Sequence, residues 1–209
     1  MGILVAALVL GACQSAYYNT LEAVGYHKRD LLVDRVEAAR DAQQSAKTQF
    51  QSALEEFSAV IHFDGGELER QYEKLNHEYE LSEAEAEAVT ERIDSVENVA
   101  EALFEEWDDE LDEYSNDGLR RNSERQLEET RERYGQLIEA MRRAEATTGP
   151  VLAAFRDQVL ALKHNLNAQA IAALQNELVA VETDVAALIR EMEASIREAD
   201  AFLNAMETG

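Results

Sequence analysis

Residues 86–107 read AEAVTERIDSVENVAEALFEEW, and this stretch decides the fold. Its apolar and small residues recur at alternating steps of three and four: Ala86, Val89, Ile93, Val96, Ala100, Leu103 and Trp107. That spacing is the 3.5-residue repeat of supercoiled helices, in which one seam of each helix faces its neighbours. The stretch therefore predicts a long helix that packs along one face.

The same repeat extends outward from this stretch over most of the chain. The seams cover residues 32–60, 68–107, 127–162 and 171–206. One proline and nine glycines leave few helix breakers between them. Ala, Glu, Leu, Arg and Gln dominate, which is typical of long or coiled helices. The sequence predicts an all-α protein with four long helices.

Capping signals separate the four helices. Residues 19–22 (Asn-Thr-Leu-Glu) resemble the opening of the first helix, and turns are expected at 64–67, 115–118 and 164–167. Asp64 can cap a helix while Glu67 completes a capping box. The segments between these signals are about 45, 49, 45 and 40 residues long.

Short turns between helices of similar length favour an elongated antiparallel, up-down-up-down, four-helix coiled-coil bundle. Folding the chain back at the second turn places Trp107 near Leu127, and folding at the third places Met141 near Met192. Large residues then often face small ones, as core packing requires. The alternative is a three-helix bundle with a protruding arm. One bundle domain, residues 19–207, is expected.

Pro150 interrupts the third predicted helix. A proline inside a helix costs about 3 kcal/mol and kinks it. Thr147 and Thr148 could instead cap a new helix that begins there. Because the heptad phase runs from Leu127 to Leu162 without a slip, we favour one helix kinked near Pro150.

The N-terminal residues carry a signal for location. Residues 1–12 are uncharged and end in Leu10-Gly11-Ala12 before Cys13, the only cysteine in the chain. They resemble a bacterial lipoprotein signal peptide, although its usual basic residues are missing, and the run is too short for a transmembrane helix of about 20 residues. The prediction is a signal peptide at 1–12, lipidation at Cys13 and a tether at 13–18. The alternative is a buried N-terminal helix in which Cys13 is a core residue.

The charge of the chain restricts its partners. The 43 acidic and 19 basic residues give a net charge of −24. Such a surface argues against nucleic acid, whose phosphates need a basic surface, and against adsorption onto anionic lipid head groups. We therefore predict no nucleic-acid partner.

Two charged clusters are candidate sites. Residues 105–113 contain seven acids around Trp107 and Leu111, but they lack the spacing of a calcium loop, so a solvated and partly paired face is favoured over a metal site. The second cluster could touch lipid or a partner, or could form ion pairs within its own helix. It contains His27, Lys28, Arg29 and Arg35.

No catalytic constellation is recognisable, and the four histidines lack the spacing of a di-iron bundle site. We predict no enzymatic activity, no cofactor, no catalytic residue and no bound metal.

Several strings of the chain resemble one family. They include residues 17–22 (YYNTLE), 25–30 (GYHKRD), 63–68 (FDGGEL), 150–159 (PVLAAFRDQV) and 162–168 (LKHNLNA). These resemble an uncharacterised proteobacterial family, the domain of unknown function 2959 group, over about residues 17–202. The resemblance implies a helix-rich cell-envelope protein and transfers no functional residue.

The predicted function is that of a structural scaffold or adaptor that binds another envelope protein through a helical face. By resemblance to lipoprotein sorting signals, Gln14 after the cysteine implies the periplasmic face of the outer membrane, with a lipid anchor as the membrane contact. Oligomers are compatible with this function. The alternatives are a membrane-remodelling helical coat, disfavoured by the acidity, and a divalent-cation-binding protein.

Overall fold

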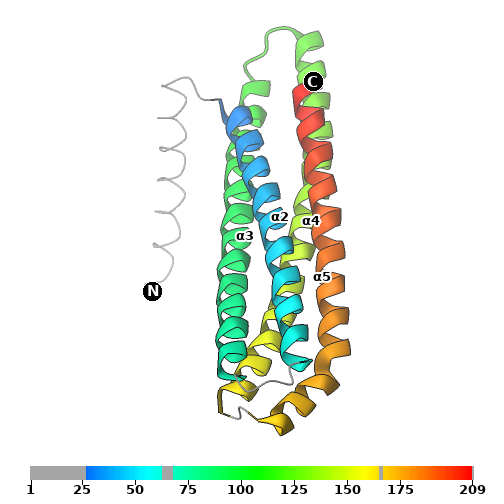
Figure 1. Cartoon of the computed structure of the whole chain (residues 1–209). Helices are drawn as coiled ribbons and strands as arrows, with labels where there is room; N and C mark the ends of the chain where they lie inside the picture. The colour runs from blue at the N-terminus through cyan, green and yellow to red at the C-terminus, as the bar shows by residue number, and fades with distance from the viewer. Residues whose placement is uncertain (1–26, 63–67, 165–166, 209) are drawn as a thin grey trace, which may run out of the picture.

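The computed structural model describes residues 27–62, 68–164 and 167–208. They form four helices in the order α2 (Lys28–Ile61), α3 (Leu68–Leu111), α4 (Asp117–His164) and α5 (Ala168–Thr208) (Figure 1). Those three ranges contain no strand, and the prediction of an all-α four-helix bundle is confirmed. The predicted signal peptide, Cys13, the tether, the cap at Asn19 and the turn at 64–67 lie outside the described residues.

Each helix packs against two neighbours. Helix α2 contacts α3 and α5, and α4 contacts the same two helices. The ammonium of Lys28, at the start of α2, is 2.8 Å from Glu106 near the end of α3, whereas Gln49 further along α2 bonds to Glu78. The two helices therefore run in opposite directions, and the chain direction alternates around the bundle (Figure 1).

The bundle is elongated because its helices are long. At about 1.5 Å per residue, the 44 residues of α3 and the 48 residues of α4 extend roughly 65–70 Å. All four helices contribute to a common core, so the alternative of three helices with a protruding arm is wrong.

The predicted seams form this core. Every seam residue predicted in α2, from Leu32 to Val60, is buried. In α3, α4 and α5 the predicted seam residues are all buried or half-buried, and the half-buried ones lie mainly near helix ends. Burial of apolar surface stabilises the folded state by about 25 cal/mol per Å². This burial is the main contribution that holds the four helices together.

Two asparagines begin the last two helices. The Oδ1 atom of Asn116 accepts bonds from the backbone N–H groups of Gly118 (2.8 Å) and Leu119 (3.2 Å). The Oδ1 atom of Asn167 accepts the N–H of Gln169 at 2.9 Å. Both satisfy N–H groups that have no partner inside the helix. The turns predicted at 115–118 and 164–167 thus fall where one helix ends and the next begins.

Helix α4 continues through Pro150 without a break. The proline is exposed, so water can reach the backbone carbonyl that loses its partner there. The hydroxyls of Thr147 and Thr148 donate to the carbonyls of Ala144 and Glu145, at 2.6 and 2.7 Å, instead of capping a new helix. The prediction of one continuous helix is confirmed, and the kink stays a prediction.

One polar pair lies in the middle of the core. The hydroxyl of Ser195 in α5 donates to Oε1 of Gln43 in α2 at 2.8 Å, and both side chains are fully buried. The Nε2 atom of Gln43 has no hydrogen-bond partner within the described part of the chain. Such a pair links two helices at one height and so favours a single register.

Candidate functional site

The two ends of the bundle are built differently. At one end α2 begins at Lys28 and α5 ends at Thr208, while α3 and α4 continue past them to their connecting turn (Figure 1). We call this region the open end, and the opposite region, where α2 meets α3 and α4 meets α5, the closed end. At the open end the number of helices packed side by side falls from four to two within the described residues. Seam residues there are therefore buried by fewer neighbouring helices.

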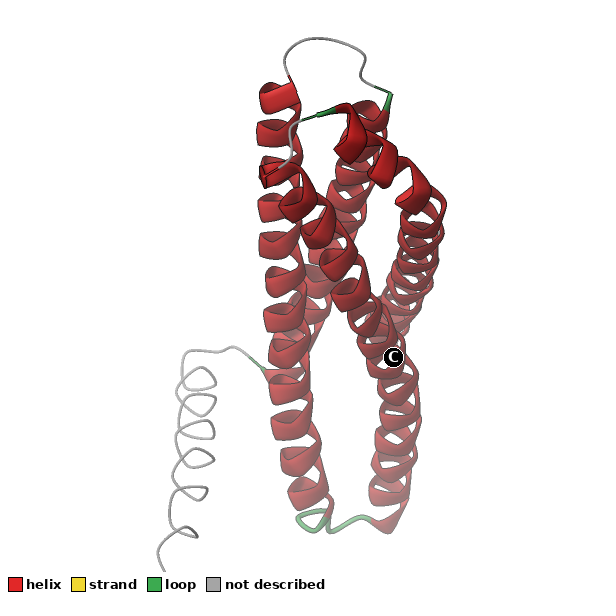
Figure 2. Cartoon of the chain, turned by 90° about the horizontal axis from the view of Figure 1, so that it is seen from below, coloured by secondary structure: helices red, strands yellow, loops and turns green. Residues whose placement is uncertain are grey.

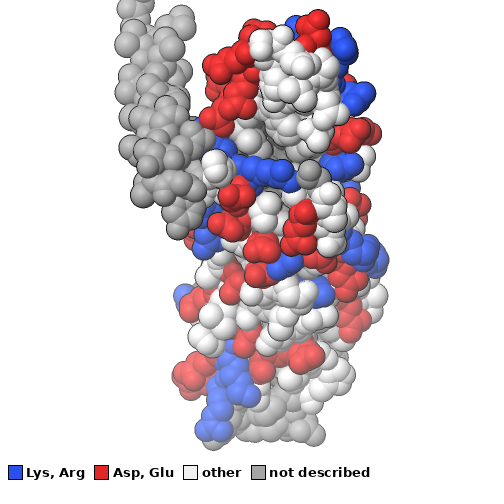
Figure 3. Space-filling view, turned by 90° about the horizontal axis from the view of Figure 1, so that it is seen from above, with Lys and Arg blue, Asp and Glu red and all other residues white. Residues whose placement is uncertain are grey.

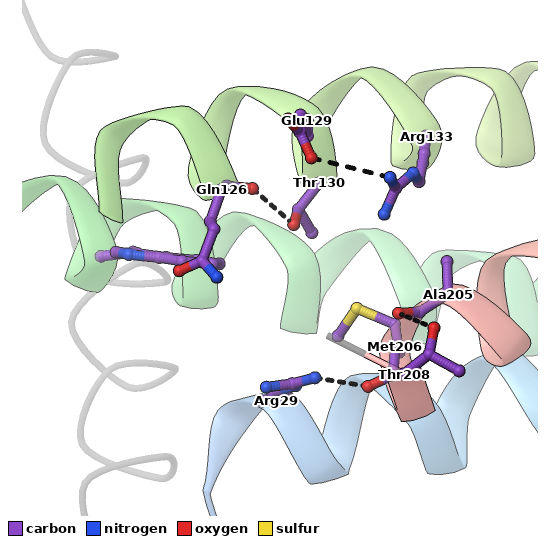
Figure 4. Close-up of a pocket in the computed structure, with 9 residues that line it drawn as sticks. Arg29, Gln126, Glu129, Thr130, Arg133, Ala205, Met206 and Thr208 are labelled. Carbon is purple, nitrogen blue, oxygen red and sulfur yellow. Dashed lines mark hydrogen bonds and ion pairs between the residues drawn. The ribbon is translucent and has the colours of Figure 1, made fainter. Parts of the chain in front are cut away.

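A cavity of about 350 Å³ lies at the open end, where all four helices contribute (Figure 4). Its apolar lining comes from Trp107 of α3 and from Ala205 and Met206 of α5. Arg29 of α2 and Arg133 of α4 supply two positive charges. The remaining lining is polar and consists of Gln126, Glu129, Thr130 and Thr208.

The two arginines are held in different ways. The guanidinium of Arg29 donates to the backbone carbonyl of Met206 and ties the start of α2 to the end of α5 (Figure 4). Arg133 lies 3.7 Å from Glu129, one turn earlier on α4, and both side chains are at least half exposed. An exposed pair at this spacing contributes only about 0.3–0.5 kcal/mol. Arg133 can therefore exchange this partner for another anion at little cost.

Trp107 lines the cavity, and a hydrogen bond fixes the position of its ring. Its indole Nε1 donates to the hydroxyl of Ser123 at 2.8 Å, which fixes the ring between α3 and α4. A second hollow of about 210 Å³ shares Arg133 and Ala205 with the first and reaches the buried ring of Phe202. The two hollows adjoin along the α4–α5 interface.

The cluster of His27, Lys28, Arg29 and Arg35 does not form one exposed patch. Lys28 is only 5% exposed and pairs with Glu106, so its ammonium joins α2 to α3. Arg29 contacts the end of α5, His27 is exposed and Arg35 is half-buried. Lys28 is thus a structural contact, and a docking role for the other three stays a prediction.

Some of the acids at 105–113 take part in ion pairs. Glu106 pairs with Lys28, Asp108 with Arg131, and Asp112 lies 4.0 Å from Arg120. Nowhere in the described ranges do three or more His, Cys, Asp or Glu side chains lie close enough to hold a metal ion.

Tyr134 lies beside the open end, where its ring packs edge-to-face on Phe104 at a centroid distance of 5.4 Å. Burial, reinforced by the negative charge of Glu97, raises the pKa of Tyr134 to about 12. Burial and the hydrogen bond to Glu83 likewise raise the pKa of Tyr79 to about 12. Neither tyrosine is a candidate base, because each keeps its proton at neutral pH.

Arg142 links α4 to α3 and has the most carboxylate partners of any described arginine. Its guanidinium bonds to Glu97, Glu145 and Asp94, and the hydrogen bond to Glu97 is the largest cause of its raised pKa. This network joins α4 to α3, and its carboxylates are already paired with the guanidinium of Arg142. On the face of the molecule seen in Figure 3, basic side chains are interspersed with acidic ones.

A search for membrane-spanning segments among the described residues found no helix with a sufficiently long apolar run.

A family model described as a protein of unknown function (DUF2959) matches residues 17–206. The chain belongs to this family. No curated protein and no solved structure matches the chain significantly. The family description assigns no activity, so the chemistry of the open end has to follow from its own residues.

Sequence reasoning did not find the cavity. Trp107 and Thr130 look like ordinary seam residues, and Arg133 looks like one of several arginines that neutralise the preceding helix. Arg29 is far from them in the sequence. The sequence did not signal this end, because it predicted a first helix that opens at residues 19–22, whereas α2 begins at Lys28.

Proposed function

We propose that this DUF2959 protein is an envelope lipoprotein that acts as a scaffold or adaptor. In this proposal Cys13 carries the lipid anchor, the outer membrane holds it, and the helical bundle faces the periplasm. Support comes from the lipoprotein-like residues Leu10-Gly11-Ala12-Cys13 and from a long bundle in which several ion pairs link one helix to the next.

The observation that carries the adaptor role is an uncharged face on α5. Its residues recur at the heptad steps of four and three, and all are exposed: Ala172, Asn176, Val179, Thr183 and Ala186. Val179 is 70% exposed, the highest value among the large apolar residues that the structure describes. In a chain that is 30% charged, an uncharged face with helical-seam spacing suits a partner helix.

The segment between Cys13 and α2 would hold the bundle with its open end toward the lipid anchor. Residues 14–27 separate Cys13 from α2 and can reach at most roughly 50 Å when fully extended. The closed end lies a further length of α2 away, about 51 Å for its 34 residues. A partner on the α5 face would therefore be held at a defined range of heights above the membrane.

Two measurements test the proposal. Mass spectrometry of the N-terminal peptide is expected to show an acylated Cys13, and a Cys13→Ser variant is expected to leave the membrane fraction. A photo-crosslinking residue at Val179 or Thr183 is expected to capture one envelope protein, whereas the same residue at exposed Glu91 on α3 is not. An unmodified Cys13 contradicts the proposal. So does capture of the same protein from the α5 positions and from Glu91.

A further inference from the structure

We propose that the cavity at the open end binds a phosphate group carried on a short apolar chain. The placement of this cavity near a membrane rests on the proposed function, but its chemistry rests on the lining residues alone. Nothing in the family description assigns a ligand to this position.

The charge of the cavity favours an anion. Arg29 and Arg133 come from helices on different sides of the cavity, and both side chains border the same space (Figure 4). Glu129 is the only acid in the lining, so the cavity carries a positive balance in a chain of net charge −24. Arginine presents several N–H donors in a planar fork that matches phosphate oxygens.

Both arginines have donors to offer. Arg29 gives one N–H to the carbonyl of Met206, and a guanidinium has five. The 3.7 Å pair of Arg133 with Glu129 is exposed to solvent. A phosphate between the two guanidiniums would replace a weak surface contact and would leave the α2–α5 contact intact.

The rest of the lining favours an apolar body behind the phosphate. Trp107, Ala205 and Met206 form a surface without charge. The adjoining hollow adds Ala201 and Phe202 along α4 and α5, with Glu198 as the one acid in its lining. A volume of about 350 Å³ lies at the lower end of the range for small-molecule sites. Six carbons and a phosphate fit this space, so hexyl phosphate is a suitable test compound.

The chain contains a reporter for this site. Trp107 is the only tryptophan, so intrinsic fluorescence reads the cavity wall directly. The full chain, held in vesicles of neutral phosphatidylcholine, is titrated with hexyl phosphate, inorganic phosphate and hexanol. We expect hexyl phosphate to change the Trp107 emission, with an apparent affinity at least about tenfold above that of the other two compounds.

The variants separate charge from shape. Arg133→Gln is expected to weaken hexyl phosphate binding about tenfold. Arg143→Gln is the matched control, because Arg143 also sits on α4, pairs with a glutamate four residues earlier and is 52% exposed, against 50% for Arg133. Ala205→Leu keeps both charges and fills the cavity, so it is expected to abolish binding of hexyl phosphate. Far-UV circular dichroism of each variant verifies that the bundle remains folded.

A second arm identifies the source of the phosphate. Brominated acyl chains quench a tryptophan that they touch, so vesicles with brominated phosphatidylglycerol are compared with brominated phosphatidylcholine. Stronger quenching by phosphatidylglycerol that Arg133→Gln removes assigns the group to a lipid. Hexyl phosphate binding without such quenching assigns it to a soluble phosphate ester.

Three results would overturn the proposal: no emission change with hexyl phosphate, an equal response to hexanol, or equal binding in the Arg133→Gln and Arg143→Gln variants. None of these depends on acylation at Cys13, so failure of the cavity proposal and failure of the lipoprotein proposal are distinguishable.

Discussion

The closed and open ends of the bundle use the same kind of residue in different ways. At the closed end, Phe57 of α2 and Phe155 of α4 pack edge-to-face at 6.4 Å, and both are fully buried. At the open end, Trp107 occupies an equivalent seam position but is half-buried beside a cavity. Figure 2 shows the bundle from the opposite, closed end. A heptad position buries an aromatic ring fully only where enough helices surround it. The cavity is the consequence of fewer helices.

The largest expected effect compares one aromatic residue from each end. Phe57→Ala is expected to lower the free energy of unfolding by about 3–5 kcal/mol, because it leaves a void among four helices. Trp107→Ala is expected to cost less, roughly 1–2 kcal/mol, because the indole already borders open space. Urea denaturation followed by circular dichroism measures both. Equal losses would show that the open end is packed as tightly as the closed end.

The polar pair in the middle of the bundle tests how far the close packing extends. Ser195→Ala removes the hydrogen bond that the buried side chain of Gln43 makes within the described residues, and it is expected to cost about 1–3 kcal/mol. The double variant with Gln43→Leu removes both polar groups and is expected to recover most of that loss. If the double variant is no more stable than Ser195→Ala, water satisfies Gln43 and the middle is more open than its burial indicates.

Two arginines at the open end are expected to differ in their effect on stability, because Arg131 contacts α3 and Arg133 borders the cavity. Arg131 pairs with Asp108 and lies 5.3 Å from the centre of the Phe104 ring. Arg131→Gln is expected to cost about 1 kcal/mol through loss of the ion pair and the cation–π contact. Arg133→Gln, two residues away, is expected to change stability by less than about 0.5 kcal/mol. A larger loss for Arg133 than for Arg131 would mean that the cavity arginine is structural.

The smallest expected effect is a pH dependence beside the open end. The folded pKa of Tyr134, about 12, lies above the ordinary tyrosine pKa of 10.0, so folding favours the protonated ring. Its contribution to stability is complete below pH 10 and is lost as the pH rises toward 12. Thermal melts between pH 9 and 12 are expected to fall less steeply for Tyr134→Phe than for the natural chain. Parallel curves would mean that the ring is already solvated.

Much of the fold was readable because it is repetitive. The heptad seams gave the number of helices and their buried faces, and the turns expected at 115–118 and 164–167 fell between helices. The continuous helix at Pro150 followed from an unbroken phase. Individual ion pairs were less predictable. A shift of a few residues along a seam changes every surface partner, so the spacing within one helix did not identify the pair of Asp108 with Arg131.

The sequence by itself determined an all-helical bundle, its seams and its acidity, because each depends on residue spacing and composition within one helix. The tertiary structure alone decided that Lys28 turns inward to Glu106 and that Arg29, Trp107 and Arg133 share one cavity. The reason is physical: a seam specifies which face is buried, but the relative ends of four packed helices decide where that burial stops.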